Sequence, residues 1–294
     1  MTTFRQAKAA RRIEEEIMGL RIQTNVASLN AQRNLSGASN QLATSYRRLS
    51  TGLRISSAAD DAAGLAISER LRSRIRSIQQ SERNANDGIS LVQTAEGALN
   101  EVSSILIRMR ELAIQASNGT LAPEDQNTIN EEFQAIKNEI ERIAQATSFS
   151  GLDLLNGATA AIRLQIGPGT TAGVDTLDVS LVATTAASLG ISALGIGATY
   201  SDKTIAVNGI DTAINSVTQL RGSLGATQNR LESTINQLQI DEENLSAAES
   251  RIRDLDIAKE TANLTRASIL QQAAISILQQ ANVQPQSALS LLQG

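Results

Sequence analysis

The residues whose types and spacing come closest to a chemical site are the adjacent carboxylates Asp60 and Asp61, in the segment RISSAADDAAG. A carboxylate pair could hold a metal ion or act as general acid and base. No third ligand lies nearby in the sequence, so a negative charge at a helix N-terminus explains the pair better. Gly64 lacks a surrounding lysine-containing glycine-rich loop and fits close helix contact rather than phosphate binding.

Composition excludes several kinds of chemistry. The chain has no His and no Cys, which removes Ser-His and Cys-His catalysis, zinc sites built on these residues and thiol redox reactions. The net charge of −4 argues against broad affinity for nucleic acids. Matches to N-x-S/T at Asn34, Asn118, Asn244 and Asn263 are short enough to arise by chance. We therefore expect neither an enzyme nor a bound cofactor.

The apolar residues favour paired helices over a large globular core. They make up 41% of the chain, but aromatic residues make up only 2%, so Ala, Leu and Ile must supply the packing. With three prolines in 294 residues, long helices meet few breakers. The first 17 residues contain basic side chains but no apolar core, so they do not resemble a signal peptide.

The N-terminal part predicts two helices separated by a glycine- and serine-rich break. Residues 20–49 carry Ile22, Val26 and Leu29 on one face, with Leu35 and Leu42 at a seven-residue spacing. The break covers residues 50–64, and a long helix is expected over 61–116. Its second half has an a/d seam formed by Val92, Ala95, Leu99, Val102, Leu106, Met109, Ala113 and Ala116.

A turn and a returning helix follow. The segment SNGTLAPEDQ (117–126) ends one helix near Gly119 and opens the next at Pro123. The second helix repeats apolar residues at three-four spacing from Ile129 to Ile143. Together these segments predict an antiparallel helical hairpin.

The centre of the chain changes to β-type patterning. Residues 161–167 and 176–182 alternate apolar and polar side chains on either side of a glycine-containing loop, which predicts a β-hairpin. Residues 183–210 are rich in Gly, Ala, Ser and Thr and are expected to be irregular.

Heptad spacing returns in the C-terminal part with Leu224, Leu231, Leu238, Leu245 and Ile252. A helix over 224–255 would be about 48 Å long and would need partner helices along that length. If the two ends of the chain run back together, the molecule is a rod whose central sequence lies at one tip.

The last segment, 267–294, has no charged residue and is still too polar for a membrane span. Ala267, Leu270, Ala274, Ile277 and Ala281 form one apolar helical stripe. Such a stripe, backed by amides and hydroxyls, suits a helix packed among protein helices or facing a narrow wet passage.

Several long segments resemble bacterial flagellins. LRIQTNVASLNAQRNLS (20–36), RLSTGLRISSAADDAAGLAIS (48–68) and RNANDGISLVQTAEGALNE (83–101) are similar to the N-terminal region of that family. The segment from 249 to 292, ESRIRDLDIAKETANLTRASILQQAAISILQQANVQPQSALSLL, is similar to the C-terminal region. The resemblance covers almost all of 18–150 and the chain from about 220 onward.

The resemblance implies a mainly α fold, with a long antiparallel coiled-coil-like rod and a small central β-hairpin. It implies an inner terminal-helix domain (18–56 and 258–294), a rod domain (57–160 and 205–257) and a tip (161–204), without a large outer domain. Family members begin close to Met18, so residues 1–17 would be an extension or a misassigned start.

The implied function is a secreted structural subunit that polymerises into the extracellular flagellar filament for swimming motility. Export would pass through the flagellar secretion channel, and the terminal helices would fold on assembly. Implied partners are further copies of the chain, an export chaperone, hook-associated and cap proteins and a vertebrate Toll-like receptor. Neither nucleic acid nor membrane insertion is expected.

Three sets of residues follow from these expectations. Filament-core assembly is expected of apolar residues in the two terminal segments: Ile22, Val26, Leu29, Leu35, Leu42, Leu270, Ala274, Ile277, Leu278, Ala281 and Leu289. Rod packing is expected of the two seams: Val92, Leu99, Val102, Leu106, Met109, Leu231, Leu238, Leu245 and Ile252. By resemblance, receptor recognition falls on Arg108, Leu112 and Glu132.

Two alternatives share some of these features. A hook–filament junction protein would have similar terminal helices but usually diverges in the coiled-coil segments quoted above. A signalling coiled coil, such as a chemoreceptor fragment, would need uninterrupted heptads without a central hairpin and would leave the uncharged tail unexplained.

Overall fold

The computed structural model describes residues 24–197 and 199–293, with the side chains of the last helix described as far as Val283. The described chain forms two compact units: unit 1 contains the described residues through Arg70 and from Ala248 onward, and unit 2 contains Leu71–Ala247. The extension at 1–17, together with Ile22 and the side chain of Leu289, lies outside the described part. The three-part domain scheme stays a prediction.

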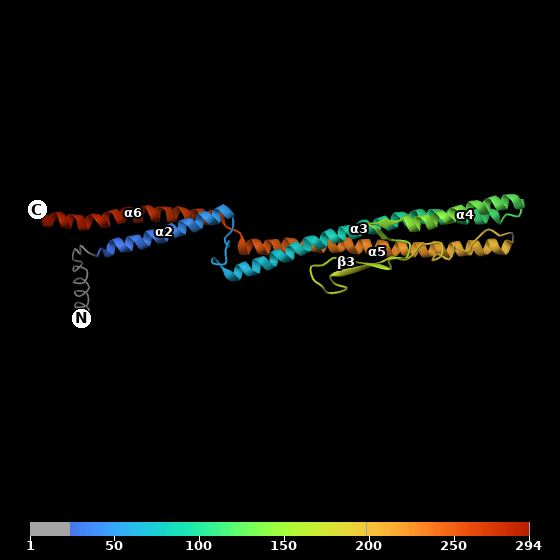
Figure 1. The fold of residues 1–294 in the computed structure, drawn as a ribbon, viewed down its shortest axis with the longest axis horizontal. Helices are drawn as coiled ribbons and strands as arrows, with labels where there is room; N and C mark the ends of the chain where they lie inside the picture. The colour runs from blue at the N-terminus through green and yellow to red at the C-terminus, as the bar shows by residue number, and fades with distance from the viewer. Residues whose placement is uncertain (1–23, 198, 294) are drawn as a thin grey trace, which may run out of the picture. The chain divides into compact units, whose positions relative to one another are not determined.

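Unit 1 is built around two paired helices, α2 (Val26–Thr51) and α6 (Ile257–Gln293) (Figure 1). Asn25 caps α2, because its side-chain oxygen accepts a hydrogen bond from the Ser28 backbone N–H at 3.0 Å. Gly52 ends α2 at a φ of 69°, a left-handed conformation that glycine adopts without strain. The first and last described helices of the chain therefore pair with each other.

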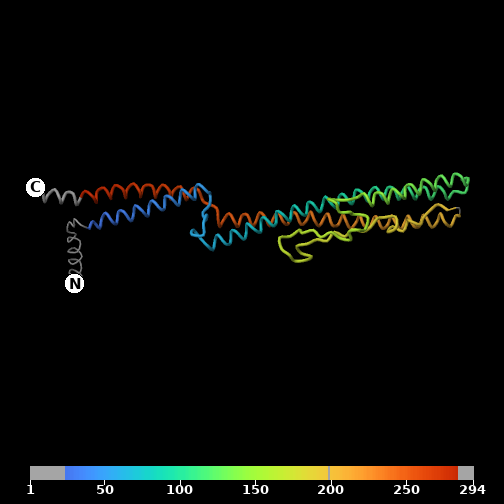
Figure 2. Tube along the Cα trace, viewed as in Figure 1, coloured from blue at the N-terminus to red at the C-terminus, as the bar shows by residue number. Residues whose placement is uncertain are grey.

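Two long helices, α3 (Ala62–Ala116) and α5 (Tyr200–Arg253), make up most of unit 2. Their antiparallel register is fixed by contacts such as Gln79 Nε2 to Glu242 Oε1 at 2.6 Å and Arg110 Nε to Asp211 Oδ1 at 2.7 Å. Helix α4 (Pro123–Ala146) returns along α3 after a tight turn (Figure 2). The predicted helical hairpin is confirmed.

Two small antiparallel hairpins accompany these helices. Strands β3 (Ala161–Gln165) and β4 (Thr176–Ser180) pair in the predicted hairpin, with Ile162 opposite Val179 and Leu164 opposite Leu177. A second hairpin joins β1 (Ser148–Phe149) to β2 (Leu152–Asp153) and was not predicted. Its two-residue turn has positive φ at Ser150 and Gly151, and strands this short show no alternation.

The expectation that 183–210 is irregular is correct only for its first part, because α5 already begins at Tyr200. Ala206, Ile210 and Ala213 of this helix are buried in the core of unit 2. That core also contains Leu99, Leu106, Met109 and Phe133. The small side chains that suggested a loop are therefore helical packing residues.

Candidate assembly surface

The contact between α2 and α6 is lined by small side chains. Ala31 and Ala38 of α2 are buried, as are Ala267, Ala274 and Ala281 of α6. Small side chains let two helix backbones approach closely, so most of the seam is formed by alanines, with Leu42 as its one large buried apolar residue among the described side chains. The five residues of the predicted C-terminal stripe therefore do not share one environment. Its three alanines face α2 of the same chain, and its two larger residues do not.

Large apolar side chains of the same pair point away from this seam. On α6, Leu270 is 49% exposed and Ile277 is 59% exposed, although both belong to the predicted stripe. Tyr46 of α2 is exposed, and the exposed large aliphatic residues among the described side chains of α2 and α6 are Val26, Leu29, Ile257, Ile269, Leu270, Ile275, Ile277 and Val283. We call this set the outer apolar set. Leu35 and Leu278 are half-buried, whereas Leu42 is buried.

Polar contacts fix the register of the helix pair at both of its ends. Near the start of α2, Asn25 Nδ2 donates to the Ala281 carbonyl at 2.7 Å and Ser28 Oγ donates to Asn282 Oδ1 at 3.0 Å. Near its other end, Ser45 Oγ donates to Glu260 Oε1 at 2.5 Å, and Glu260 is only 5% exposed. Buried polar groups of this kind restrict sliding between helices that otherwise present similar alanine surfaces.

A polar cavity of about 420 Å³ lies beside this buried carboxylate, between α2 and α6. Its lining includes Arg48, Glu260, Asn263 and Arg266. Glu260 already accepts hydrogen bonds from Ser45 and from Asn263 Nδ2, the latter at 3.3 Å. The carboxylate therefore orders the helix pair and is not a free acid or base.

The two aspartates that opened the sequence analysis have separate structural roles. Asp60 accepts hydrogen bonds from the hydroxyl and backbone N–H groups of Ser57 and Ser56, and Arg47 and Arg48 lie within 3.8 Å of it. The hydrogen bonds from Ser57 and Ser56, that of the Ser57 hydroxyl foremost, lower the pKa of Asp60 to about 2.

Asp61 instead accepts a hydrogen bond from the Gly64 N–H at 2.9 Å and so caps the beginning of α3. Gly64 has no room for a side chain, because an added Cβ would lie 2.7 Å from Ile55 Cδ1. Within the described residues, no three His, Cys, Asp or Glu side chains gather to hold a metal ion. The pair therefore orders the segment between α2 and α3.

The residues expected to pack the rod lie at different depths. Val92, Leu99, Val102, Leu106, Met109 and Leu231 are fully buried and Leu238 is nearly so, whereas Leu245 and Ile252 are half-buried.

The residues that the resemblance assigns to receptor recognition also differ in exposure. Arg108 is half-exposed and donates to Glu132 Oε1 at 2.8 Å and to Glu111 Oε2 at 3.2 Å. Leu112, by contrast, has no exposed surface. The structure brings Arg108 and Glu132 together but places Leu112 in the core behind them, more deeply than partial packing would.

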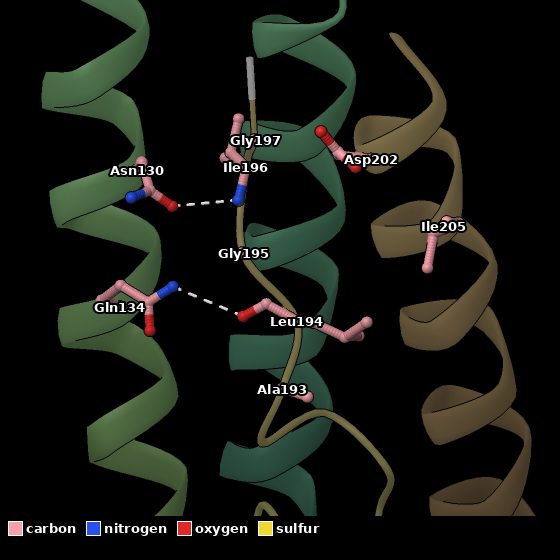
Figure 3. Close-up of a pocket in the computed structure, with 9 residues that line it drawn as sticks. All are labelled: Asn130, Gln134, Ala193, Leu194, Gly195, Ile196, Gly197, Asp202 and Ile205. Carbon is pink, nitrogen blue, oxygen red and sulfur yellow. Dashed lines mark hydrogen bonds between the residues drawn. The ribbon is translucent and has the colours of Figure 1, made fainter. Parts of the chain in front are cut away.

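A second cavity, of about 370 Å³, lies in unit 2 between α4, the loop before α5 and the first turns of α5 (Figure 3). Asn130 Oδ1 accepts a hydrogen bond from the Ile196 N–H at 2.9 Å, and Gln134 Nε2 donates to the Leu194 carbonyl at 3.4 Å. Asp202, which also lines the cavity, accepts a hydrogen bond from the Thr199 hydroxyl at the start of α5. The polar groups here hold the loop against α4.

This arrangement defines a class: a protein of long paired helices whose terminal pair has exposed large apolar side chains. In the part of the chain that the structure describes, no helix is long and apolar enough to cross a membrane. Sequence models for the bacterial flagellin N-terminal helical region and the bacterial flagellin C-terminal helical region match residues 22–160 and 207–292, respectively.

Two curated flagellins are similar in sequence to this chain along nearly its whole length. A flagellin of Halalkalibacterium halodurans is 48% identical over 92% of this chain and 99% of its own length. A flagellin of Bacillus subtilis is 42% identical over 93% of this chain and 100% of its own length. The chain belongs to the bacterial flagellin family.

A solved structure, described as a flagellar hook-associated protein of Vibrio parahaemolyticus, shares the fold. It is 18% identical, with a TM-score of 0.57, and the match covers 66% of this chain and 100% of that chain. As a flagellin, the present chain is a structural subunit of the extracellular flagellar filament and not an enzyme.

Proposed function

We propose that the outer apolar set of α2 and α6 forms the contact between neighbouring subunits in the innermost layer of the filament. The supporting observation is how the apolar side chains are divided: alanines and Leu42 are buried within the chain, while residues such as Leu270 and Ile277 remain exposed. Exposed apolar groups of this extent mark interaction surfaces. Non-closing contacts between identical subunits generate an open helical filament.

We also propose that unit 1 completes its folding on assembly, as the resemblance implies. An alanine seam buries little apolar area, and hydrophobic stabilisation scales with that area at about 25 cal/mol per Å². The α2–α6 pair is therefore weak alone and gains stability when neighbouring subunits cover Leu270 and Ile277. The predicted rod-packing residues of unit 2 would stay buried before and after assembly.

The assembly proposal is tested by replacing Leu270 and Ile277 together with serine and following filament growth from seeds by negative-stain electron microscopy. We expect growth to stop, because the apolar contact between subunits is lost. Val174→Ser is the matched control, since Val174 is an exposed apolar residue in the β3–β4 loop of unit 2. Normal growth of the Leu270/Ile277 variant would refute the assigned contact.

Export and further partners belong to the same proposal. We propose that the chain leaves the cell through the flagellar secretion channel and that a chaperone groove takes the α6 face with Leu270, Ile277 and Leu278. Cap and hook-associated proteins would contact it during and after assembly. In cells that lack the flagellar export apparatus, we expect the chain to be retained inside the cell. Immunoblotting of cells and medium measures this.

For Toll-like receptor recognition, the exposed ion pair between Arg108 and Glu132 is the surface that a receptor could contact. Substituting Arg108, Leu112 and Glu132 by alanine should abolish signalling by the monomer in a receptor reporter assay. Leu112→Ala alone should act through unfolding, because truncating a buried leucine costs about 2–5 kcal/mol. Arg108→Ala should reduce signalling with an unchanged urea midpoint. Unchanged signalling by the triple variant would exclude this surface.

A further inference from the structure

The chain contains three Asn-Gly pairs, Asn118-Gly119, Asn156-Gly157 and Asn208-Gly209, and the structure places them in three different settings. An Asn-Gly pair can react with itself: the glycine backbone nitrogen attacks the asparagine Cγ and a C–N bond forms. The bond from Cγ to Nδ2 breaks and ammonia leaves. Water then opens the resulting succinimide to aspartate or isoaspartate, so no oxidant, reductant or enzyme is required.

The reaction needs a carboxamide that can rotate toward a mobile, unhindered backbone nitrogen. Asn118, Gly119 and Thr120 are all exposed, in the turn between α3 and α4. The side chain of Asn118 makes one weak hydrogen bond, in which Oδ1 accepts from the Thr120 N–H at 3.3 Å. That donor can stabilise the negative charge that develops on Oδ1 during attack. The Gly119 N–H makes no hydrogen bond within the described chain.

The other two pairs are held against reaction. At Asn156, Oδ1 accepts from the Ala158 N–H at 2.8 Å, but Nδ2 also donates to Asp153 Oδ2 at 2.7 Å. With both ends engaged, the carboxamide plane cannot turn toward the Gly157 nitrogen without losing a strong hydrogen bond. Asn208 and Gly209 lie inside α5, where the helix fixes the backbone and engages its N–H groups.

We infer that Asn118 is a site of spontaneous deamidation in the folded protein, with water as the only co-reactant. The product carries a new carboxylate just beyond the C-terminal end of α3, where the helix dipole disfavours negative charge. Isoaspartate also adds one carbon to the backbone of the turn between α3 and α4. The modification therefore changes both the charge and the geometry of this turn.

The experiment incubates the purified full-length chain in warm, mildly alkaline buffer and follows all three peptides by mass spectrometry. Asn118 should convert on the order of tenfold faster than Asn156 or Asn208, a ratio that corresponds to about 1.4 kcal/mol in barrier height. In denaturant, the three pairs should react at similar rates, because only the folded structure distinguishes them.

Gly119→Ala is the matched variant. An added Cβ at Gly119 would have no neighbour within 4 Å and would meet no positive φ, so the turn should be retained. The methyl group hinders attack by the backbone nitrogen, and conversion of Asn118 should slow on the order of tenfold, again about 1.4 kcal/mol. Conversion of Asn156 or Asn208 as fast as that of Asn118, or an unchanged rate in Gly119→Ala, would overturn the inference.

Discussion

At the scale of single residues, Asp60 and Asp61 are neighbours in the sequence with different tasks. Asp60 gathers the N–H and hydroxyl groups of Ser56 and Ser57, whereas Asp61 caps α3 through Gly64. Sequence reasoning assigned both aspartates to the start of a helix, and the hydrogen bond from the Gly64 N–H confirms this position for Asp61. It could not assign Asp60, because the partners of Asp60 depend on how the chain turns between α2 and α3.

Asp60→Asn should lower the stability of unit 1 by about 1–3 kcal/mol at neutral pH, since it removes charge-assisted hydrogen bonds. The pKa of Asp60 falls from 3.8 to about 2 on folding, so its stabilising contribution is present above pH 3.8 and is lost as the pH falls toward 2. Urea unfolding of assembled filaments, in which unit 1 is folded, should therefore show the difference between variant and parent shrinking as the pH falls through this range.

Asp61→Asn provides the control for this prediction. Asparagine caps a helix about as well as aspartate, so this substitution should leave stability nearly unchanged. Equal losses in the two variants at neutral pH would mean that negative charge near α3, and not the hydrogen bonds of Asp60, stabilises the segment.

At the scale of elements, the space around two glycines of α3 shows how closely neighbouring segments approach the helix. Gly88 lies under the β3–β4 hairpin, and an added Cβ would fall 2.4 Å from Leu164 Cδ1. Gly97, in the same helix, has no atom within 4 Å of that position. Alanine substitutions at these two glycines therefore distinguish the effect of helix propensity on stability from the effect of packing.

Gly97→Ala should raise the free energy of unfolding of unit 2 by up to about 1 kcal/mol, because alanine is the better helix former. Gly88→Ala should lower it by about 1 kcal/mol, because overpacking displaces Leu164 and the hairpin. Urea unfolding followed by circular dichroism gives both values. Equal stabilisation by the two substitutions would show that the hairpin does not pack tightly on α3.

The elements that sequence reasoning found have strong periodicity, and those it missed have specific local reasons. Strands β3 and β4 alternate clearly, but the start of α5 is composed of small and polar residues. A signal was present there: Thr199 and Asp202 form a capping box in which Asp202 N donates to Thr199 Oγ1 at 3.3 Å and Thr199 N donates back to Asp202 Oδ2 at 3.3 Å. The spacing of these residues could have located the helix N-terminus.

Sequence analysis named four residues of the outer apolar set, Val26, Leu29, Leu270 and Ile277, but not Ile257, Ile269, Ile275 or Val283. The three-four spacing of Ala267, Leu270, Ala274 and Ile277 defines one helical stripe, and it cannot show which members face a partner in the same chain. The structure separates them by size, because close helix packing selects the alanines for the seam. Leu270 and Ile277 then remain outside.

At the scale of the whole molecule, the two units are packed by different side chains. Unit 2 contains a continuous core rich in Leu, Ile and Val, whereas the pair in unit 1 meets mainly through Ala and Ser, with Leu42 and a buried Glu260. We therefore expect unit 2 to fold by itself, and under the proposed assembly the stability of unit 1 depends on what covers its outer apolar set. Anything that binds only the folded form adds to its stability by mass action.

The alanine seam links the intrinsic helix tendency of α2 to the critical concentration for polymerisation. If unit 1 folds only as a subunit joins the filament, the free energy of forming α2 is part of the free energy of subunit addition. Gly37 lies in the interior of α2 with no atom within 4 Å of an added Cβ. Gly37→Ala should favour the helix by about 1 kcal/mol and lower the critical concentration about fivefold, although it touches no neighbour.

Sedimentation of filaments at graded subunit concentrations measures this quantity directly. Gly97→Ala, which strengthens a helix already folded in the free subunit, should leave the critical concentration unchanged. A shift with Gly97→Ala but not with Gly37→Ala would place the coupling in unit 2. Under this proposal, the critical concentration of the subunit can be adjusted by a substitution that adds no contact within the chain.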